Sequence, residues 1–447
     1  MSKNNPHKLG ARIWFNLILF GFMGQVAWAV ENVYFNTYLF NYIGGNANDV
    51  SKMVSFSAVA AVLTTFIMGT LSDKLNKRKL FISVGYILWG FTVAVFAWIS
   101  RENIGSLFHI SDSAKVLAVT VSIVIIMDCV MTFMGSTSND AAFNAWITDV
   151  TVPENRGVAE SVLSLLPLFA MAIVTVAFGA GVSAAGYPAC FIALGALVTI
   201  CGVLGLFTLK DSRSGEKTKS NYFKDIVYGF RPSVVKENKN LYIALAAMAI
   251  FNCAVQVFLP YIFIYTQHFM GLDFNNLGSV LTPKVIAAAA AAVVLAVAAI
   301  VFLGKGIDKY GKSKFIFLSV ILFIAGLCLT YFSRTLAPFG ISALIMLLGY
   351  AMLMIVLNAS VRDFTPEDKA GLFQGVRMIF AVLIPMVTGP SLGAYVTNRF
   401  APLHEAATYI NDYNEVVNVP VPEIFLAAAA VGIFIIIPAI FLRKKLK

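Results

Sequence analysis

The sequence predicts an all-α integral membrane protein with twelve transmembrane helices, arranged as two pseudo-symmetric bundles of six. Three observations lead to this fold class. The 447 residues are 59% hydrophobic and only 13% charged, whereas about 25% of the residues of a soluble domain are charged. Long apolar segments occur in two sets of six, and a short basic motif recurs at the same place in each set.

Each predicted helix is an apolar segment of about 20 residues or more, the length that crosses a bilayer. The first six fall at 11–42, 50–72, 79–99, 115–147, 158–184 and 188–209. After a polar stretch, six more follow at 241–268, 277–303, 314–333, 338–360, 372–395 and 423–442. The predicted parts of the chain are therefore an N-terminal bundle over 1–209, a cytoplasmic linker over 210–240 and a C-terminal bundle over 241–447.

The repeated motif is Gly-x-x-x-Asp-Lys followed by further basic residues. It reads GTLSDKLNKRK at 69–79, with Gly69, Asp73 and Lys74, and GKGIDKYGKSK at 304–314, with Gly304, Asp308 and Lys309. A second pair of similar runs is DVTVPENRG at 149–157 and DFTPEDKAG at 363–371. Both pairs occupy corresponding connections of the two halves, which indicates a duplicated membrane bundle.

Basic residues gather in alternate connections between the predicted helices. Of the 33 Lys and Arg residues, 26 lie in the two termini, the linker and alternate loops. The positive-inside rule places these regions in the cytoplasm, so we expect a multi-pass protein of the cell membrane with both termini cytoplasmic. The net charge of +10 then reflects topology and attraction to anionic lipid headgroups, not nucleic-acid binding.

The sequence carries none of the motifs expected of an enzyme or an ATP-driven pump. It has no phosphate-binding loop, dinucleotide-binding glycine pattern or nucleophile elbow. Its five cysteines and four histidines show no metal-ligand spacing, and the cysteines are expected to be free thiols. We therefore predict a carrier that is not an enzyme, holds no cofactor and no metal, and takes any energy it uses from an ion or solute gradient.

Polar residues inside the first predicted helix indicate the path of the solute. A charged group deep in a membrane costs at least about 2.5–3.5 kcal/mol and usually faces a cavity. The run QVAWAVENVYF contains Gln25, Trp28, Glu31 and Asn32, of which positions 25, 28 and 32 share a helical face. Their amide, carboxylate and indole groups suit a sugar, so we predict that they bind the solute. The alternative is that Trp28 is a packing or lipid-facing residue and Glu31 lies near the outer surface.

Two aspartates of the fourth predicted helix are candidates for ion coupling. Asp128 lies near the middle of the apolar run, and Asp140 follows near its end. A carboxyl group removed from water favours its protonated form, as a proton-coupled carrier requires. We predict Asp140 as the coupling residue, with Asp128 or Glu31 as substitutes. The alternative is a structural aspartate that is neutral or forms a salt bridge. Arg377 in the eleventh helix is the natural partner of Asp140, or binds a solute oxygen instead.

The predicted solute site draws on both halves of the chain. Asn139 precedes Asp140, and Asn252 and Gln256 lie at i and i+4 of the seventh predicted helix. Amides at this spacing occupy one helical face and hydrogen-bond hydroxyl groups. The complete predicted set for the solute is Gln25, Trp28, Glu31, Asn32, Asn139, Asn252, Gln256 and Arg377.

The twelve-helix layout and the paired loop motifs resemble the major facilitator superfamily over nearly the whole chain. This resemblance implies that Asp73 helps to hold a cytoplasmic gate against the start of the eleventh helix. Asn76 stands where the motif of that superfamily commonly has Gly.

Two shorter runs resemble the glycoside–pentoside–hexuronide cation symporters, namely Asn139-Asp140-Ala141-Ala142-Phe143 and Phe373-Gln374-Gly375-Val376-Arg377. The resemblance implies uptake of a sugar or glycoside with a sodium ion or a proton. In the melibiose-type members, an Asp of helix 4 joins acids of helix 2 at the cation site. Asp140 matches the former, but the run VSFSAVAAVLTTFIMG of helix 2 contains no acid. We therefore predict symport of a small polar solute, a sugar or glycoside, with a cation by alternating access, and we expect a proton rather than a sodium ion. The alternative is a proton-coupled drug or metabolite exporter of the same superfamily.

Overall fold

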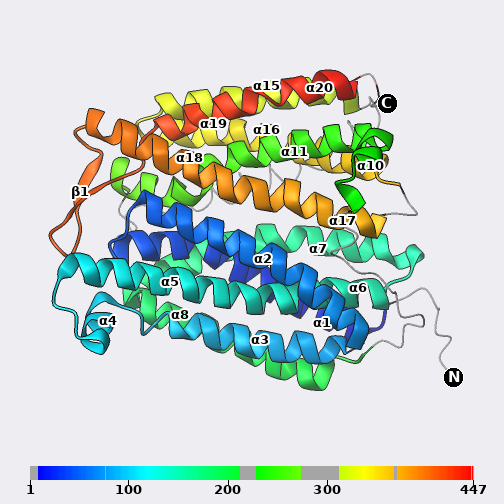
Figure 1. The fold of residues 1–447 in the computed structure, drawn as a ribbon, viewed down its shortest axis with the longest axis horizontal. Helices are drawn as coiled ribbons and strands as arrows, with labels where there is room; N and C mark the ends of the chain where they lie inside the picture. Colours follow the sequence, from blue (N-terminus) through cyan, green and yellow to red (C-terminus); the bar gives the residue numbers. More distant parts are fainter. Residues whose placement is uncertain are drawn as a thin grey trace. The chain divides into compact units, whose positions relative to one another are not determined.

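A computed structural model describes residues 9–75, 77–211, 228–272, 312–366, 370–443 and 445, and this part of the chain is almost entirely helical (Figure 1). The described residues form two compact units. The first unit draws on Met1–Gly45 and Val59–Tyr222. The second draws on Asn46–Ala58 and Phe223–Lys447.

The first unit is built from long helices that contain short π-helical segments. Its elements are α1 (Ala11–Val30), η1 (Glu31–Phe35), η2 (Tyr38–Tyr42), α3 (Arg78–Val95), α4 (Arg101–Phe108), α5 (Ser113–Gly135), η3 (Ser136–Phe143), α6 (Asn144–Val150), α7 (Pro153–Ile173), η4 (Val174–Phe178) and α8 (Gly179–Thr208). Helix α2 (Ala47–Leu75) begins in the second unit and continues into the first.

Small residues allow α3 and α8 to lie side by side in the first unit (Figure 1). A Cβ atom at Gly195 would lie 2.9 Å from the Cβ atom of Ala94, and a Cβ atom at Gly202 would lie 2.6 Å from the backbone nitrogen of Ile87. Glycines at such positions let two membrane helices approach closely and gain van der Waals contact. Trp89 of α3 is fully buried and packs against the rings of Trp28 and Tyr86.

Helix α8 contains a break that separates two membrane crossings. Gly186 has φ 80° and ψ 169°, a conformation that glycine adopts readily, and Pro188 follows it. The break falls between the two predicted segments 158–184 and 188–209, so the single helical stretch agrees with two predicted helices.

The second unit repeats this helical construction. Its described elements are α10 (Pro232–Glu237), α11 (Lys239–Phe258), η5 (Leu259–Tyr261), α12 (Ile262–Ile264), η6 (Tyr265–Phe269), α15 (Lys312–Phe332), α16 (Leu336–Phe364), α17 (Ala370–Met378), η9 (Ile379–Leu383), α18 (Ile384–Phe400), η10 (Ala401–Leu403), β1 (Thr408–Ile410), β2 (Val416–Asn418), α19 (Glu423–Ile433) and α20 (Ile436–Arg443). The strands β1 and β2 form an antiparallel hairpin between η10 and α19.

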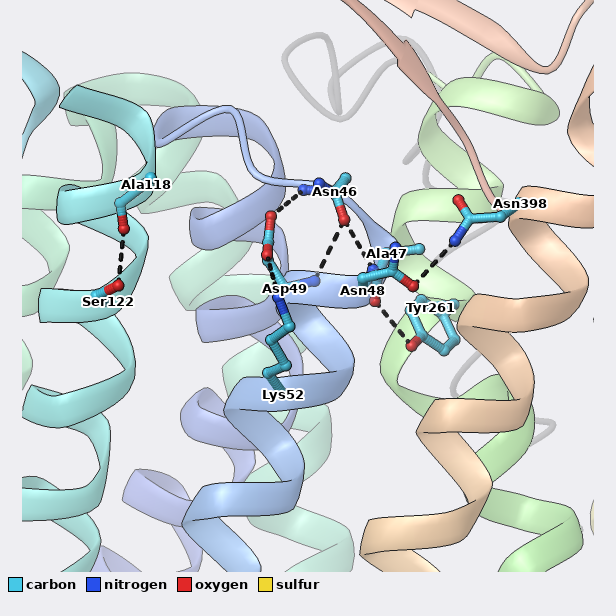
Figure 2. A network of polar contacts seen from close by, with 9 residues as sticks. All are labelled: Asn46, Ala47, Asn48, Asp49, Lys52, Ala118, Ser122, Tyr261 and Asn398. Carbon is cyan, nitrogen blue, oxygen red and sulfur yellow. Dashed lines mark hydrogen bonds and ion pairs between the residues drawn. The ribbon is translucent and has the colours of Figure 1, made fainter. Parts of the chain in front are cut away.

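Helix α2 begins with a capping arrangement, seen in Figure 2. The Asn46 side-chain oxygen accepts hydrogen bonds from the backbone N–H groups of Asn48 and Asp49, at 2.9 and 3.3 Å. In return the Asp49 carboxylate accepts one from the backbone N–H of Asn46 at 3.1 Å. This reciprocal pair satisfies N–H groups that have no partner inside the helix.

The same end of α2 is bound to other elements of the second unit. The amide of Asn398 donates a hydrogen bond to the Asn48 side chain at 2.9 Å, and the Tyr261 hydroxyl lies 3.1 Å from the backbone oxygen of Ala47 (Figure 2). One turn further along, the hydroxyl oxygens of Ser51 and Ser391 are 3.2 Å apart. These polar contacts hold the start of α2 against α18.

Ten helical stretches of the described residues are long and apolar enough to cross a membrane, and one of them, Ser161–Thr208, contains the break at Gly186. They coincide with eleven of the twelve predicted segments. The remaining prediction, 277–303, lies outside the described residues.

Candidate functional site

A polar pocket of about 380 Å³ lies within the first unit, among α1, η3, α6 and α7. Its polar lining residues are Gln25, Asn139, Asp140, Asn144, Thr148 and Ser164. Its apolar wall is made by Phe143, Ile147, Leu163 and Leu166, with Gly21 on α1. Among these lining residues Asp140 alone is ionisable, so the pocket combines one carboxyl group with amides and hydroxyls.

Asp140 is held in the π-helical segment η3. The Ser136 hydroxyl donates a hydrogen bond to its carboxylate at 2.9 Å. Thr137 and Ser138 direct their hydroxyls back to the carbonyls of Phe133 and Met134, at 2.6 and 2.8 Å. Hydroxyl side chains that bond the backbone in this way disturb regular helical geometry, and π-helical insertions are frequent at functional sites.

Asn139 is held by a contact with Tyr86 of α3. It is 5% exposed, and its side-chain oxygen lies 3.1 Å from the Tyr86 hydroxyl. That hydroxyl also bonds the backbone oxygen of Phe20 at 2.7 Å. Gly24 of α1 faces this arrangement, because a Cβ atom there would lie only 2.5 Å from the Asn139 oxygen. The absence of a side chain at position 24 therefore makes room for the amide.

We expect Gly24→Ala to destabilise the protein by about 1–3 kcal/mol, because the added methyl group overpacks against Asn139 and Tyr86. The measurement is thermal unfolding of purified protein, in which the transition should move down by several degrees. Gly340→Ala in α16 is the matched control, since a Cβ atom there meets no described atom within 4 Å. Equal unfolding temperatures for the two variants would contradict the close approach at Gly24.

The structure brings only part of the polar group of the first helix to this pocket. Gln25 lines it, but the Trp28 ring packs against Trp89 at a centroid distance of 5.0 Å. Asn32 is exposed, and its amide donates to the backbone oxygen of Trp28 at 2.8 Å. In this structure Trp28 is therefore arranged as a residue that packs against a neighbouring helix.

The two remaining acidic candidates form a second cluster, in η1 and α5. The Thr132 hydroxyl donates a hydrogen bond to the Glu31 carboxylate at 3.2 Å. Asp128 lies one turn before Thr132 and is 1% exposed. Neither Glu31 nor Asp128 lines the polar pocket. The first unit thus holds its acidic candidates at two places.

The candidates of the second unit bond to their own unit. The Asn252 amide donates to the backbone oxygen of Ala381 at 2.8 Å. The Arg377 guanidinium donates a hydrogen bond to the side-chain oxygen of Asn358 at 2.8 Å. Gln256 lies at the close approach of α11 to Gly389 of α18. Asn358 therefore holds Arg377, and the pairing of Arg377 with Asp140 stays a prediction.

The motif Gly-x-x-x-Asp-Lys is only partly within the described structure. Lys74 is exposed at the end of α2, and no described atom lies within 4 Å of the position of a Cβ atom at Gly69. The Asp73 side chain lies outside the described residues, as do Gly304, Asp308 and Lys309.

Sequence reasoning missed an ion pair beside that motif. Arg78 opens α3, is 7% exposed and donates to the Asp149 carboxylate at 3.1 Å. Its guanidinium also donates to the Ser72 hydroxyl at 2.5 Å. The available signal was that both charged residues belong to the two repeated runs, at 69–79 and 149–157. The pair joins the end of α2, the start of α3 and the end of α6.

We expect Arg78→Gln to destabilise the protein by about 3–5 kcal/mol, because it leaves the Asp149 carboxylate without its buried partner. Lys52→Gln is the matched control. This change breaks the ion pair between Lys52 and Asp49, in which the Lys52 side chain is 60% exposed. Such a surface pair contributes only about 0–1 kcal/mol to the free energy of unfolding. Thermal unfolding of both variants tests this, and a loss no larger at Arg78 than at Lys52 would contradict it.

The membrane-spanning helices define a multi-pass membrane protein, and its polar pocket has the size of a small-molecule site. The chain belongs to the Major Facilitator Superfamily, whose sequence model matches residues 17–304 and 282–447. It is therefore a transporter of that superfamily, with the two-bundle, twelve-helix fold.

Solved structures with this fold cover nearly the whole chain. A mutant of the nucleoside transporter NupG has a TM-score of 0.70 at 12% identity, over 96% of this chain and 99% of that one. A bacterial homologue of the human lysosomal transporter Spinster, in an inward-facing and occupied conformation, has a TM-score of 0.65 at 14% identity, over 98% of both chains. At such identities the likeness concerns the fold alone. No curated protein sequence matched the chain.

Proposed function

We propose that this transporter takes up a sugar or glycoside together with a proton by alternating access. The observation that carries the proposal is the 380 Å³ pocket, which combines amides, hydroxyls and one carboxyl group. Pockets of roughly 300–1,000 Å³ hold small molecules. The solute is small and polar, and no step of the proposal involves catalysis or a cofactor.

The pocket chemistry suits a solute with several hydroxyl groups. Gln25, Asn139 and Asn144 offer amide donors and acceptors, and Thr148 and Ser164 offer hydroxyls. The Phe143 ring supplies an apolar surface for the face of a sugar ring. A nucleoside is also a glycoside, and the fold likeness to a nucleoside transporter makes nucleosides part of the proposed solute class.

Asp140 is the proposed proton carrier. It is the ionisable residue among those that line the pocket, so its protonation state acts directly on the solute site. Glu31 and Asp128 are the alternative carriers. Helix α2 has no acid between Lys52 and Asp73, which favours a proton over a sodium ion. The narrower similarity to the glycoside–pentoside–hexuronide symporters, in residues 139–143 and 373–377, supports the same solute class.

Alternating access requires that contacts at the ends of helices break and form. We propose that Asp73 and Asp308 close the cytoplasmic side and that Arg377 responds to the charge of Asp140. Helix α2 belongs to the predicted N-terminal bundle and α18 to the predicted C-terminal bundle, so we propose that the hydrogen bonds between them open during the cycle.

A thermal-shift screen of the purified protein tests the solute class. The panel contains hexoses, pentoses, disaccharide glycosides and nucleosides, each with and without sodium and at two pH values. We expect stabilisation by members of one of these groups, independent of sodium. Stabilisation only by hydrophobic amines would favour the exporter, and a strict need for sodium would exclude the proton as the coupling ion.

Cysteine labelling tests the proposed topology. In a background without native cysteines, we expect single cysteines at Lys236 and Lys445 to resist a membrane-impermeant maleimide in sealed cells, because the positive-inside rule places them in the cytoplasm. A cysteine at the exposed Asp412, after β1, should react. Strong labelling at position 236 or 445 would overturn the topology.

A further inference from the structure

A long apolar groove runs along the second unit between α11 and the pair α19–α20. It has a volume of about 560 Å³ and is lined on one side by α11, from Ile243 to Cys253, and on the other from Val431 to Phe441. Ile384 of α18 completes it. Every lining residue is apolar apart from the Cys253 thiol, so the groove has no group that would recognise a sugar.

The last helix is broken beside the groove. Helix α19 ends at Ile433, and α20 begins at Ile436. Pro438 lacks the N–H that would bond the backbone of Phe434, and this loss interrupts the helix. Phe434, at the break, is 58% exposed, and Phe441, near the end of α20, is 59% exposed.

The length of the groove matches half of a bilayer. From Ile243 to Cys253 the rise along α11 is about 15 Å at 1.5 Å per residue. The hydrocarbon core of a membrane is about 30 Å thick. An acyl chain of a single leaflet therefore extends over the whole groove.

Basic residues gather at one end of the groove. Lys239 begins α11 one turn before Ile243, and Arg443 ends α20 two residues after Phe441. Lys236 of α10 and Lys445 lie at the same end of the unit, where Figure 1 places α10 and the C-terminal end of α20. All four are exposed, and Glu237 is the acid that lies among them in the sequence.

Arg443 is also held in place by an aromatic ring. Its guanidinium carbon lies 5.7 Å from the centre of the Phe317 ring of α15. Such cation–π contacts orient an arginine while leaving its N–H groups available. Clusters of Lys and Arg at the inner membrane surface attract anionic headgroups.

We propose that this groove binds one acyl chain of an anionic phospholipid of the inner leaflet, with the phosphate held by Lys236, Lys239, Arg443 and Lys445. The positive charge at one end of the groove matches an anionic headgroup, and the length of the groove matches an acyl chain of one leaflet. A zwitterionic lipid would leave the basic end without a matching net charge, and a soluble phosphate would leave the groove empty. The site is separate from the polar pocket and does not depend on the identity of the solute.

Native mass spectrometry of the detergent-purified full chain tests the proposal. Phosphatidylglycerol and phosphatidylcholine with identical acyl chains are the two probes. We expect phosphatidylglycerol to bind saturably and at least about ten-fold more tightly, since each basic residue near an anionic headgroup adds to the attraction. Inorganic phosphate in excess should not displace it.

Two variants separate the headgroup from the acyl chain. Lys239→Gln with Arg443→Gln should weaken phosphatidylglycerol binding about ten-fold, whereas Lys77→Gln with Lys210→Gln, two exposed lysines of the first unit, should not. Ala246→Trp fills the groove and should weaken binding of the same lipid. Ala196→Trp on the exposed face of α8 is its control.

Three results would overturn the proposal. Equal binding of the two lipids would show that the basic end selects nothing. An equal loss of lipid binding in Lys239→Gln with Arg443→Gln and in Lys77→Gln with Lys210→Gln would show a general effect of surface charge. Unchanged binding in Ala246→Trp, in a variant whose unfolding temperature equals that of the parent, would show that the lipid does not enter the groove.

Discussion

Asp140→Asn should abolish concentrative uptake of the solute and retain exchange of solute across the membrane. Asn keeps the size of the side chain and can still accept the hydrogen bond from Ser136, but it cannot take up and release a proton. Exchange needs no net proton movement, so it survives the change. The measurement is uptake of labelled solute into energised cells, compared with counterflow into preloaded vesicles.

Glu31→Gln and Asp128→Asn are the matched controls, because they neutralise the acidic cluster that does not line the polar pocket. We expect concentrative uptake to persist in both. Concentrative uptake that survives in Asp140→Asn and is lost in either control would move the coupling site to η1 and α5.

A disulfide between positions 51 and 391 should block transport completely. The hydroxyl oxygens of Ser51 and Ser391 are 3.2 Å apart. Replacing both residues by Cys exchanges each oxygen for a larger sulfur atom, so the two sulfurs come within bonding reach. The bond would fix the start of α2 to α18 and prevent the opening that alternating access requires. Transport should be lost on oxidation and return on reduction.

The matched control is a disulfide between positions 408 and 418, which are partners in the β1–β2 hairpin. Oxidation of Thr408→Cys with Asn418→Cys should leave transport unchanged, because both strands belong to one hairpin. Full transport by the oxidised 51–391 pair, with the cross-link verified by mass spectrometry, would contradict the opening of this contact during the cycle.

Much of the fold could be predicted from the sequence because membrane insertion is a local property. Each apolar segment of sufficient length gains transfer energy by itself, so eleven predicted helices coincide with described ones. The break at Gly186 was also predictable, since a Gly and a Pro close together between two apolar segments favour a turn. The hairpin after α18 was not, because its strands are only three residues long each.

The candidate site was predicted only in part. Gln25, Asn139 and Asp140 were selected as costly polar residues in apolar segments, and they do line one pocket. Trp28 was selected by the same helical face as Gln25, and in the structure its ring packs on Trp89. A shared face gives the direction of a side chain, and the neighbouring helix decides what that side chain meets.

The sequence by itself determined the class of protein and the positions of the eleven predicted helices that the structure describes, because hydropathy adds up along the chain. The duplication and the membrane orientation stay predictions from its motifs and basic loops. Only the tertiary structure decided that Arg78 pairs with Asp149, that Arg377 bonds Asn358 and that Gly24 makes room for Asn139. These contacts join residues far apart in sequence or on different helices. They depend on the rotation and spacing of packed helices, which are set by many small residues acting together.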